Sequence, residues 1–244
     1  MLELVAHRGY PGRFPENSLV GMRAALEAGA RYVEFDVQFT RDHVPVVLHD
    51  ASLRRTTGQR GMVFLTDYAD VASRSAGEPA RFGERFRDLR IPHLETLLEL
   101  IEGFPAVTAF VEIKRASLWK TGRAKAFDIL RDILASRSER IVLLSFDREF
   151  VARARDDFRI GWAFEPWKSH HRQAAEDLQP EYLFTSLRGL PPGHETFWQG
   201  PWRWAVYDVP SLATAQWLYS LGVDLVETDD IGDWLPDKFA SDVR

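Results

Sequence analysis

The sequence contains no cysteine among its 244 residues. This absence excludes disulfides, thiolate metal sites and a cysteine nucleophile, and it fits a reducing compartment. Long apolar runs are also missing, and no window approaches the roughly 20 apolar residues that a membrane helix needs. The first residues show no basic leader followed by an apolar stretch, so they predict no signal peptide. We therefore expect a cytoplasmic protein without stable membrane insertion.

The chain also lacks an excess of positive charge. Its formal net charge is -5, from 31 basic and 36 acidic residues. Because phosphate backbones select basic faces, this balance argues against a nucleic-acid partner. Hydrophobic residues make up 45% of the chain and charged residues 27%. Both values are ordinary for a globular protein with a full core.

Short apolar runs alternate with longer helical patterns along the whole chain, as in βα units. Eight of the runs are predicted barrel strands, at residues 2–6, 32–37, 107–113, 141–144, 160–164, 182–184, 204–207 and 223–226. Residues 44–48 are a predicted extra strand. Helical patterns fall at residues 15–29, 94–102, 122–136, 148–156, 173–178 and 211–221. This alternation predicts an α/β fold, a closed (β/α)8 TIM barrel that occupies the whole chain, 1–244, as a single domain of about 250 residues.

An open doubly wound sheet is the alternative to a closed barrel. It usually carries a glycine-rich phosphate loop after the first strand, whereas this first strand ends in His7-Arg8-Gly9. Residues 57–90 break the alternation with several glycines and many arginines. We interpret them as a small insertion between the second and third barrel strands, lying over the barrel mouth. The alternative is a surface excursion without a role.

Two carboxylates stand near the end of the second predicted strand, in Val33-Glu34-Phe35-Asp36-Val37. Residues two apart share a face of a strand, roughly 6.6 Å from each other. Two carboxylates about 4 Å apart at an effective dielectric near 20 repel by roughly 4 kcal/mol. A proton, an arginine or a metal must therefore compensate them. An ordinary ion pair with a nearby arginine or lysine is the alternative to a metal site.

The third barrel strand ends in Glu112-Ile113-Lys114, so Glu112 and Lys114 share a face as well. Because consecutive strands are neighbours in a barrel, Glu112 can complete a three-oxygen site with Glu34 and Asp36. Oxygen ligands favour one hard divalent cation, Mg²⁺ or Ca²⁺. Lys114 by itself could be a surface charge, but beside carboxylates it is better explained as a phosphate contact.

Two histidines directly follow apolar runs: His7 after the first strand and His49 after the extra strand. Both would lie at carboxyl ends of strands, where barrel active sites are found. A pair of histidines beside a metal suits general acid–base chemistry near neutral pH. Arg8 would hold a phosphate oxygen. The remaining histidines, which lack this context, are predicted packing or surface residues: His43, His93, His170, His171 and His194.

Several short motifs, in this order and spacing, resemble the glycerophosphodiester phosphodiesterase family. They are His7-Arg8-Gly9, Pro15-Glu16-Asn17-Ser18, Glu34-Phe35-Asp36, Pro45-Val46-Val47-Leu48-His49-Asp50, Ile91-Pro92-His93-Leu94-Glu95, Val111-Glu112-Ile113-Lys114, Ser145-Phe146-Asp147 and Gly222-Val223-Asp224. The resemblance covers nearly the full chain and is most specific in its N-terminal half.

The resemblance implies a TIM barrel, a divalent cation and cleavage of glycerophosphodiesters to sn-glycerol 3-phosphate and an alcohol, within lipid and glycerol metabolism. It assigns metal ligation to Glu34, Asp36 and Glu112, acid–base catalysis to the two histidines, and phosphate contacts to Arg8 and Lys114. It also makes Asn17 a loop-ordering residue near the metal. The family's proposed chemistry is attack by the glycerol 2-hydroxyl, which gives a cyclic phosphate that water then opens.

The chain departs from the family pattern at the ends of its last two strands, which read Trp204-Ala205-Val206-Tyr207-Asp208 and Glu227-Thr228-Asp229-Asp230. These departures affect the choice of substrate rather than the reaction. The residues expected to line the mouth are Phe146, Glu165, Trp167 and Trp204. The partner is thus a small glycerophosphodiester, bound by a monomer or a homodimer.

Two rival functions use the same barrel. One is a lysophospholipase D or phospholipase D activity on lipid phosphodiesters, which tryptophans near the mouth (Trp167, Trp202 and Trp204) would favour. Membrane attachment usually needs basic or apolar signals, which this chain lacks. The other is a non-catalytic phosphate-binding protein. That function predicts the loss of a ligand or a histidine, and none is lost here. Fold alone would not decide between an enzyme and a binding protein.

Overall fold

The computed structural model describes residues 2–190 and 197–235 and contains a closed parallel barrel. Its wall runs in the order β1-β9-β8-β7-β6-β5-β4-β2, and β1 pairs with β2 to close the ring. The strands are β1 (Glu3–Ala6), β2 (Tyr32–Phe39), β4 (Thr108–Ile113), β5 (Ile141–Ser145), β6 (Arg159–Ala163), β7 (Tyr182–Ser186), β8 (Arg203–Tyr207) and β9 (Leu225–Thr228). The predicted (β/α)8 barrel is confirmed.

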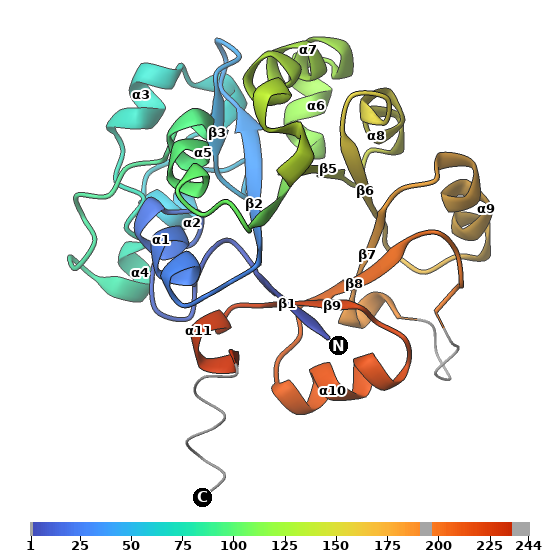
Figure 1. The fold of residues 1–244 in the computed structure, drawn as a ribbon. Helices are drawn as coiled ribbons and strands as arrows, with labels where there is room; N and C mark the ends of the chain where they lie inside the picture. The colour runs from blue at the N-terminus through green and yellow to red at the C-terminus, as the bar shows by residue number, and fades with distance from the viewer. Residues whose placement is uncertain (1, 191–196, 236–244) are drawn as a thin grey trace, which may run out of the picture.

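Helices surround the strands on the outside (Figure 1). They are α1 (Leu19–Glu27), α5 (Leu94–Glu102), α6 (Arg115–Thr121), α7 (Arg123–Leu134), α8 (Arg148–Ala154), α9 (Ser169–Leu178), α10 (Leu212–Ser220) and α11 (Ile231–Trp234). Helix α5 shows why they form this layer: Leu94, Leu97, Leu98 and Ile101 are buried. Their spacing of three and four residues makes one apolar stripe, which packs on the barrel. None of the helices in the described part of the chain is both long and apolar enough to cross a bilayer.

Residues alternate between the barrel interior and the helix layer along each strand. On β2, the side chains of Val33, Phe35 and Val37 belong to the core between strands and helices. Glu34 and Asp36 therefore face the interior. A second core fills the barrel below them, made of Val5, Phe110, Val142, Leu144, Ala163, Tyr182, Phe184, Ala205 and Leu225. The packed floor leaves the carboxyl ends of the strands as the place for polar chemistry.

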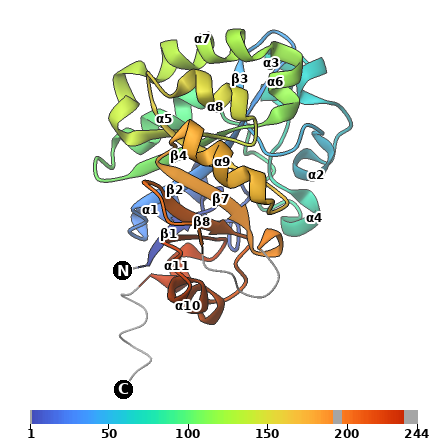
Figure 2. The ribbon, with the colours of Figure 1, turned by 90° about the vertical axis from the view of Figure 1, so that its right-hand side faces the viewer.

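The extra strand β3 (Pro45–Val47) pairs antiparallel with the end of β2. After it come α2 (Arg54–Thr57), a 3-10 turn η1 (Val63–Leu65), α3 (Tyr68–Ser73) and α4 (Pro79–Phe82). This segment has a small apolar core of its own. In Figure 1 these short helices lie outside the ring of strands, around α1 and α5, and in Figure 2 α2 and α4 lie on the opposite side of the molecule from α1 and the N-terminus. Glu78 ties the segment to the mouth, because its Oε1 accepts a hydrogen bond of 2.6 Å from the backbone of Glu16.

Candidate active site

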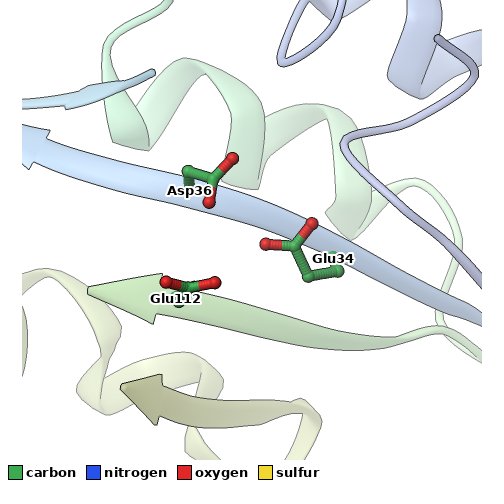
Figure 3. A group of neighbouring side chains, drawn as sticks. All are labelled: Glu34, Asp36 and Glu112. Atoms are coloured by element: carbon green, nitrogen blue, oxygen red, sulfur yellow. The ribbon is translucent and has the colours of Figure 1, made fainter. Parts of the chain in front are cut away.

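Three carboxylates converge at the carboxyl ends of β2 and β4. The register pairs Asp36 with Glu112, while Glu34 stands two residues earlier on β2. Each side chain offers one oxygen such that the three oxygens lie within 4.8 Å of one another. Figure 3 shows Glu34 and Asp36 on one strand and Glu112 on its neighbour, with their carboxylates gathered between the two. The three predicted ligands are thus brought together.

The donor set of this cluster fits a hard divalent cation. All three groups supply oxygen, which Mg²⁺ and Ca²⁺ prefer. Glu34 Oε1 is buried and has no hydrogen-bond partner among residues 2–190 and 197–235. A buried carboxylate oxygen without a partner is costly. An ion held between the three residues would therefore satisfy an oxygen that the described part of the protein leaves open.

Two basic side chains partly neutralise the negative charge of the carboxylates. Lys114 Nζ lies 2.6 Å from Asp36 Oδ1 and 2.7 Å from Glu112 Oε1, and Arg8 Nε lies 3.1 Å from Asp36 Oδ2. Burial alone would raise the pKa of Asp36, but the charges of Lys114 and Arg8 outweigh burial and hold this pKa well below its ordinary value. Burial and the charge of Asp36 raise the pKa of Glu34 well above its ordinary value. Burial thus disfavours the charged form of Glu34.

The loop after β1 places Arg8 in an unusual backbone conformation. Arg8 and Asn17 have positive φ angles of 53° and 54°, and Gly9 between them has a φ of 90°. A Cβ on Gly9 would lie 2.8 Å from the backbone nitrogen of Met22, so no larger side chain fits there without a shift. Asn17 fixes the loop to β2: its Nδ2 donates to Asp36 Oδ2 at 2.8 Å and its Oδ1 accepts from the backbone of Asp36.

His7 directly follows β1 and has a carboxylate near each ring nitrogen. Its Nδ1 lies 2.8 Å from Asp229 Oδ1, and its Nε2 lies 3.8 Å from Glu227 Oε2. Burial and the charge of Arg8 would lower the pKa of His7. The hydrogen bond to Asp229 and the charges of Glu227 and Asp229 outweigh these effects, so the pKa of His7 is raised.

His49 is oriented through a chain of ion pairs. Its Nδ1 lies 2.7 Å from Asp50 Oδ1. Arg55 bonds Asp50 and also forms two hydrogen bonds of 2.7 Å with the carboxylate of Glu16. Glu16 in turn lies 3.4 Å from Arg8 Nη1. This chain connects the second histidine with the arginine that follows the first one.

One cavity brings these groups together. It measures about 280 Å³ and is lined on its polar side by His7, Arg8, His49, Glu112, Lys114, Tyr207, Asp208 and Glu227. The apolar side is formed by Leu144, Phe146, Ala163 and Phe184. Two histidines, two cations and a ligand carboxylate thus face one small, largely polar space.

Comparison with known proteins agrees with this arrangement. The family model described as "Glycerophosphoryl diester phosphodiesterase family" matches residues 7–185, which run from the residue after β1 into β7 and include the whole carboxylate cluster. The chain belongs to this family. A glycerophosphodiester phosphodiesterase of Caldanaerobacter subterraneus is 30% identical over 236 residues, or 93% of each chain. The protein is accordingly an enzyme of the glycerophosphodiester phosphodiesterase class.

Solved structures show the same fold. A phosphodiesterase of Oleispira antarctica, solved in complex with the product sn-glycerol-3-phosphate, superposes with a TM-score of 0.83 at 22% identity. The match covers 98% of this chain and 96% of that one. A putative glycerophosphoryl diester phosphodiesterase of Silicibacter pomeroyi superposes with a TM-score of 0.82 at 23% identity, over 99% and 94% of the two chains.

The predicted mouth residues fall into two groups in this family member. Phe146 lines the central cavity, and Glu165 borders the adjoining groove together with His49 and Lys114. Trp204 does not reach the mouth: it is buried in the helix layer, stacked 5.1 Å from Trp167 between ring centroids. Successive side chains of a strand face opposite sides. Because Ala205 faces the barrel interior, Trp204 faces the helices. Trp167 packs against the same core, so the structure brings neither tryptophan to the cavity.

The histidines outside the site have packing roles. His93 caps α5, since its Nδ1 accepts a hydrogen bond from the backbone of Glu95. His171 packs in the aromatic cluster, 4.7 Å from Phe164 between ring centroids. His194 lies outside the described residues.

Sequence reasoning missed several groups of the site. Glu227 was the easiest of these groups to predict. Leu225 faces the barrel interior, so the residue two positions later faces it as well. Because the predicted strand ended at residue 226, the alternation was not extended to Glu227. Tyr207 follows from the same alternation, since it stands two residues after the inward-facing Ala205, whereas Asp50 and Asp229 carry no comparable local pattern. The insertion reaches the edge of the mouth, since Met62 borders the groove next to the cavity and Glu78 accepts a hydrogen bond from the backbone of Glu16. That residues 57–90 lie over the mouth stays a prediction.

Proposed function

We propose that the enzyme hydrolyses glycerophosphodiesters to sn-glycerol 3-phosphate and an alcohol, with one Mg²⁺ or Ca²⁺ bound by Glu34, Asp36 and Glu112. The observation that supports this proposal best is the shared cavity. Both histidines, Arg8, Lys114 and Glu112 line a space of about 280 Å³. The three-oxygen cluster lies directly beside it.

The bound cation would supply charge neutralisation for the phosphodiester. Arg8 and Lys114 bind its remaining oxygens and keep them oriented. Each histidine has Nδ1 against an aspartate, His7 at 2.8 Å and His49 at 2.7 Å. Each Nε2 is thus the nitrogen free to exchange a proton with substrate. One histidine takes the proton of the attacking oxygen, and the other protonates the leaving alcohol.

Replacement of each histidine by alanine tests the two-histidine scheme. We expect kcat to fall by about 10²- to 10⁴-fold in His7→Ala and in His49→Ala, with the cation still bound. The substrate is glycerophosphocholine, and His93→Ala is the matched control because His93 caps a helix outside the site. Near wild-type turnover in either variant would show that the scheme is wrong. Full activity in EDTA would overturn the cation requirement.

A lysophospholipase D activity is the second candidate, and one feature favours it. A groove that shares His49, Lys114 and Phe146 with the cavity runs outward past Met62. Two exposed apolar side chains belong to the elements next to it, Leu65 at 56% and Trp119 at 77% exposed. Such a surface could accept an acyl chain. The comparison of turnover on glycerophosphocholine and lysophosphatidylcholine separates the two activities, and we expect the water-soluble diester to be preferred.

A further inference from the structure

Glu227 is a buried carboxylate in the cavity that the proposed chemistry does not use. It stands on β9, where its Cα is paired with that of Val5 on β1. Only 4% of its surface is exposed, and it lines the cavity beside His7 and Tyr207. The carboxylate therefore faces the space in which the substrate must lie.

No group within the described ranges donates a hydrogen bond to this side chain. His7 Nε2 lies 3.8 Å from Oε2, which is beyond hydrogen-bond distance. A buried acceptor without a donor costs free energy, so the position suits a donor that arrives with a ligand.

The phosphate cannot be that donor. A phosphodiester is anionic and has only acceptor oxygens, so it is repelled by Glu227. The cations that attract it, Arg8 and Lys114, lie at the carboxylates of β2 and β4. On the β9 side the substrate must therefore present a hydrogen-bond donor.

We propose that Glu227 binds a hydroxyl group of the polyol part of the substrate and thereby selects polyol phosphodiesters over simple ones. This inference rests on the proposed function and adds a specificity-determining residue to it. The carboxylate accepts the hydroxyl hydrogen, while the phosphate lies toward Arg8 and Lys114. The selected hydroxyl then lies next to His7 Nε2, 3.8 Å from the carboxylate.

Calorimetric binding of two small anions tests the proposal without turnover. The probes are sn-glycerol 3-phosphate, which carries hydroxyls, and methyl phosphate, which carries none, both with Mg²⁺ present. In Glu227→Leu we expect sn-glycerol 3-phosphate to bind about tenfold more weakly, or about 1.4 kcal/mol. Methyl phosphate should bind within about twofold of wild type. The matched control is Glu99→Gln, which removes an equal charge from the exposed face of α5.

The variant Glu227→Gln keeps an acceptor oxygen. It tests the proposal even if the leucine variant does not fold. We expect this variant to weaken sn-glycerol 3-phosphate binding by about threefold, because a neutral acceptor is weaker than a charged one. In turnover of glycerophosphocholine we expect KM to rise with little change in kcat. Equal loss for both probes, or no loss for either, would overturn the role of Glu227. Failure of the wild-type enzyme to cleave glycerophosphocholine would instead overturn the proposed function.

Discussion

His7 lies between two carboxylates: one orients the imidazole ring, and the other affects the charge in the cavity. Asp229 is bonded to Nδ1 at 2.8 Å and fixes which nitrogen faces the cavity. Glu227 faces Nε2, and burial raises its pKa to about 7. A carboxylate so poised can be neutral or charged near physiological pH. The charge in the cavity therefore depends on pH at two places: at Glu227 on β9 and at the carboxylate cluster.

The pair of His7 and Asp229 makes the pH dependence of stability predictable. The folded pKa of His7 is raised, so its contribution is complete below the unfolded value of about 6.5 and is lost as pH rises through the folded value. Partial desolvation would raise the pKa of Asp229, but its bond to His7 outweighs this effect and lowers the pKa. Its contribution is complete above the unfolded value of about 3.9 and is lost as pH falls through the folded one.

We therefore expect Asp229→Asn to lower the free energy of unfolding more at pH 5.5 than at pH 8.5. Since Asp229 is exposed, solvent screening limits the difference to about 0.2–1 kcal/mol. Urea titrations at both pH values measure it. Asp230→Asn is the control, because it removes a neighbouring charge and leaves the bond to His7 intact. Equal destabilisation at the two pH values would contradict a charged pair.

The loop between β1 and α1 is the element that places Arg8. Ser18 caps α1 by accepting a hydrogen bond from the backbone of Gly21, and Asn17 ties the loop to Asp36. Gly9 allows the loop to pack closely on α1, because a Cβ at this position would lie only 2.8 Å from the backbone nitrogen of Met22. The site geometry thus depends on close backbone packing at a single glycine.

Replacement of Gly9 by alanine should damage both stability and activity. The left-handed conformation alone costs about 1–2 kcal/mol, and the contact with Met22 adds to it. The control is Gly29→Ala, where φ is 100° and nothing lies within 4 Å of the added Cβ. We expect a larger fall in melting temperature for Gly9→Ala. We also expect about a 10²-fold loss of kcat in this variant alone, because a displacement of about 1 Å at the site is enough for that.

The predicted strands differ from the observed ones mainly at their ends. Strand β9 continues to Thr228 rather than stopping at residue 226, and this extension carries Glu227 into the cavity. Helix α6 follows Lys114 directly and was not predicted, since seven residues are too few for a clear period. The short helices of 54–82 were missed for the same reason.

For the whole molecule, the cation site couples ligand binding to stability. Mg²⁺ or Ca²⁺ at about 100 times its dissociation constant should stabilise the fold by about 2.7 kcal/mol. For a chain of this size that corresponds to a rise in melting temperature of roughly 5–11 °C. The rise should disappear in Glu112→Gln and persist in the exposed control Glu95→Gln. An equal rise in both variants would place the cation elsewhere.

The pH dependence of cation binding follows from Glu34. Its raised pKa means that a proton competes with the cation for this carboxyl. Affinity should therefore fall as pH decreases, with release of a proton when the cation binds. Calorimetry in buffers of different ionisation enthalpy counts that proton. Binding without proton release would show that Glu34 is already charged or is not a ligand.

The sequence by itself determined the barrel and the carboxylate cluster. Strand periodicity is local, so Glu34, Asp36 and Glu112 could be assigned to one face from positions two apart and from neighbouring strands. The orientation of the histidines was decided only by the tertiary structure. His7 meets Asp229 across 222 residues of chain, and His49 reaches Arg8 only through Asp50, Arg55 and Glu16. The pairing of β1 with β9 creates the contact of His7, and packing of α2 on the loop after β1 connects Arg55 with Glu16. Local patterns do not encode either arrangement.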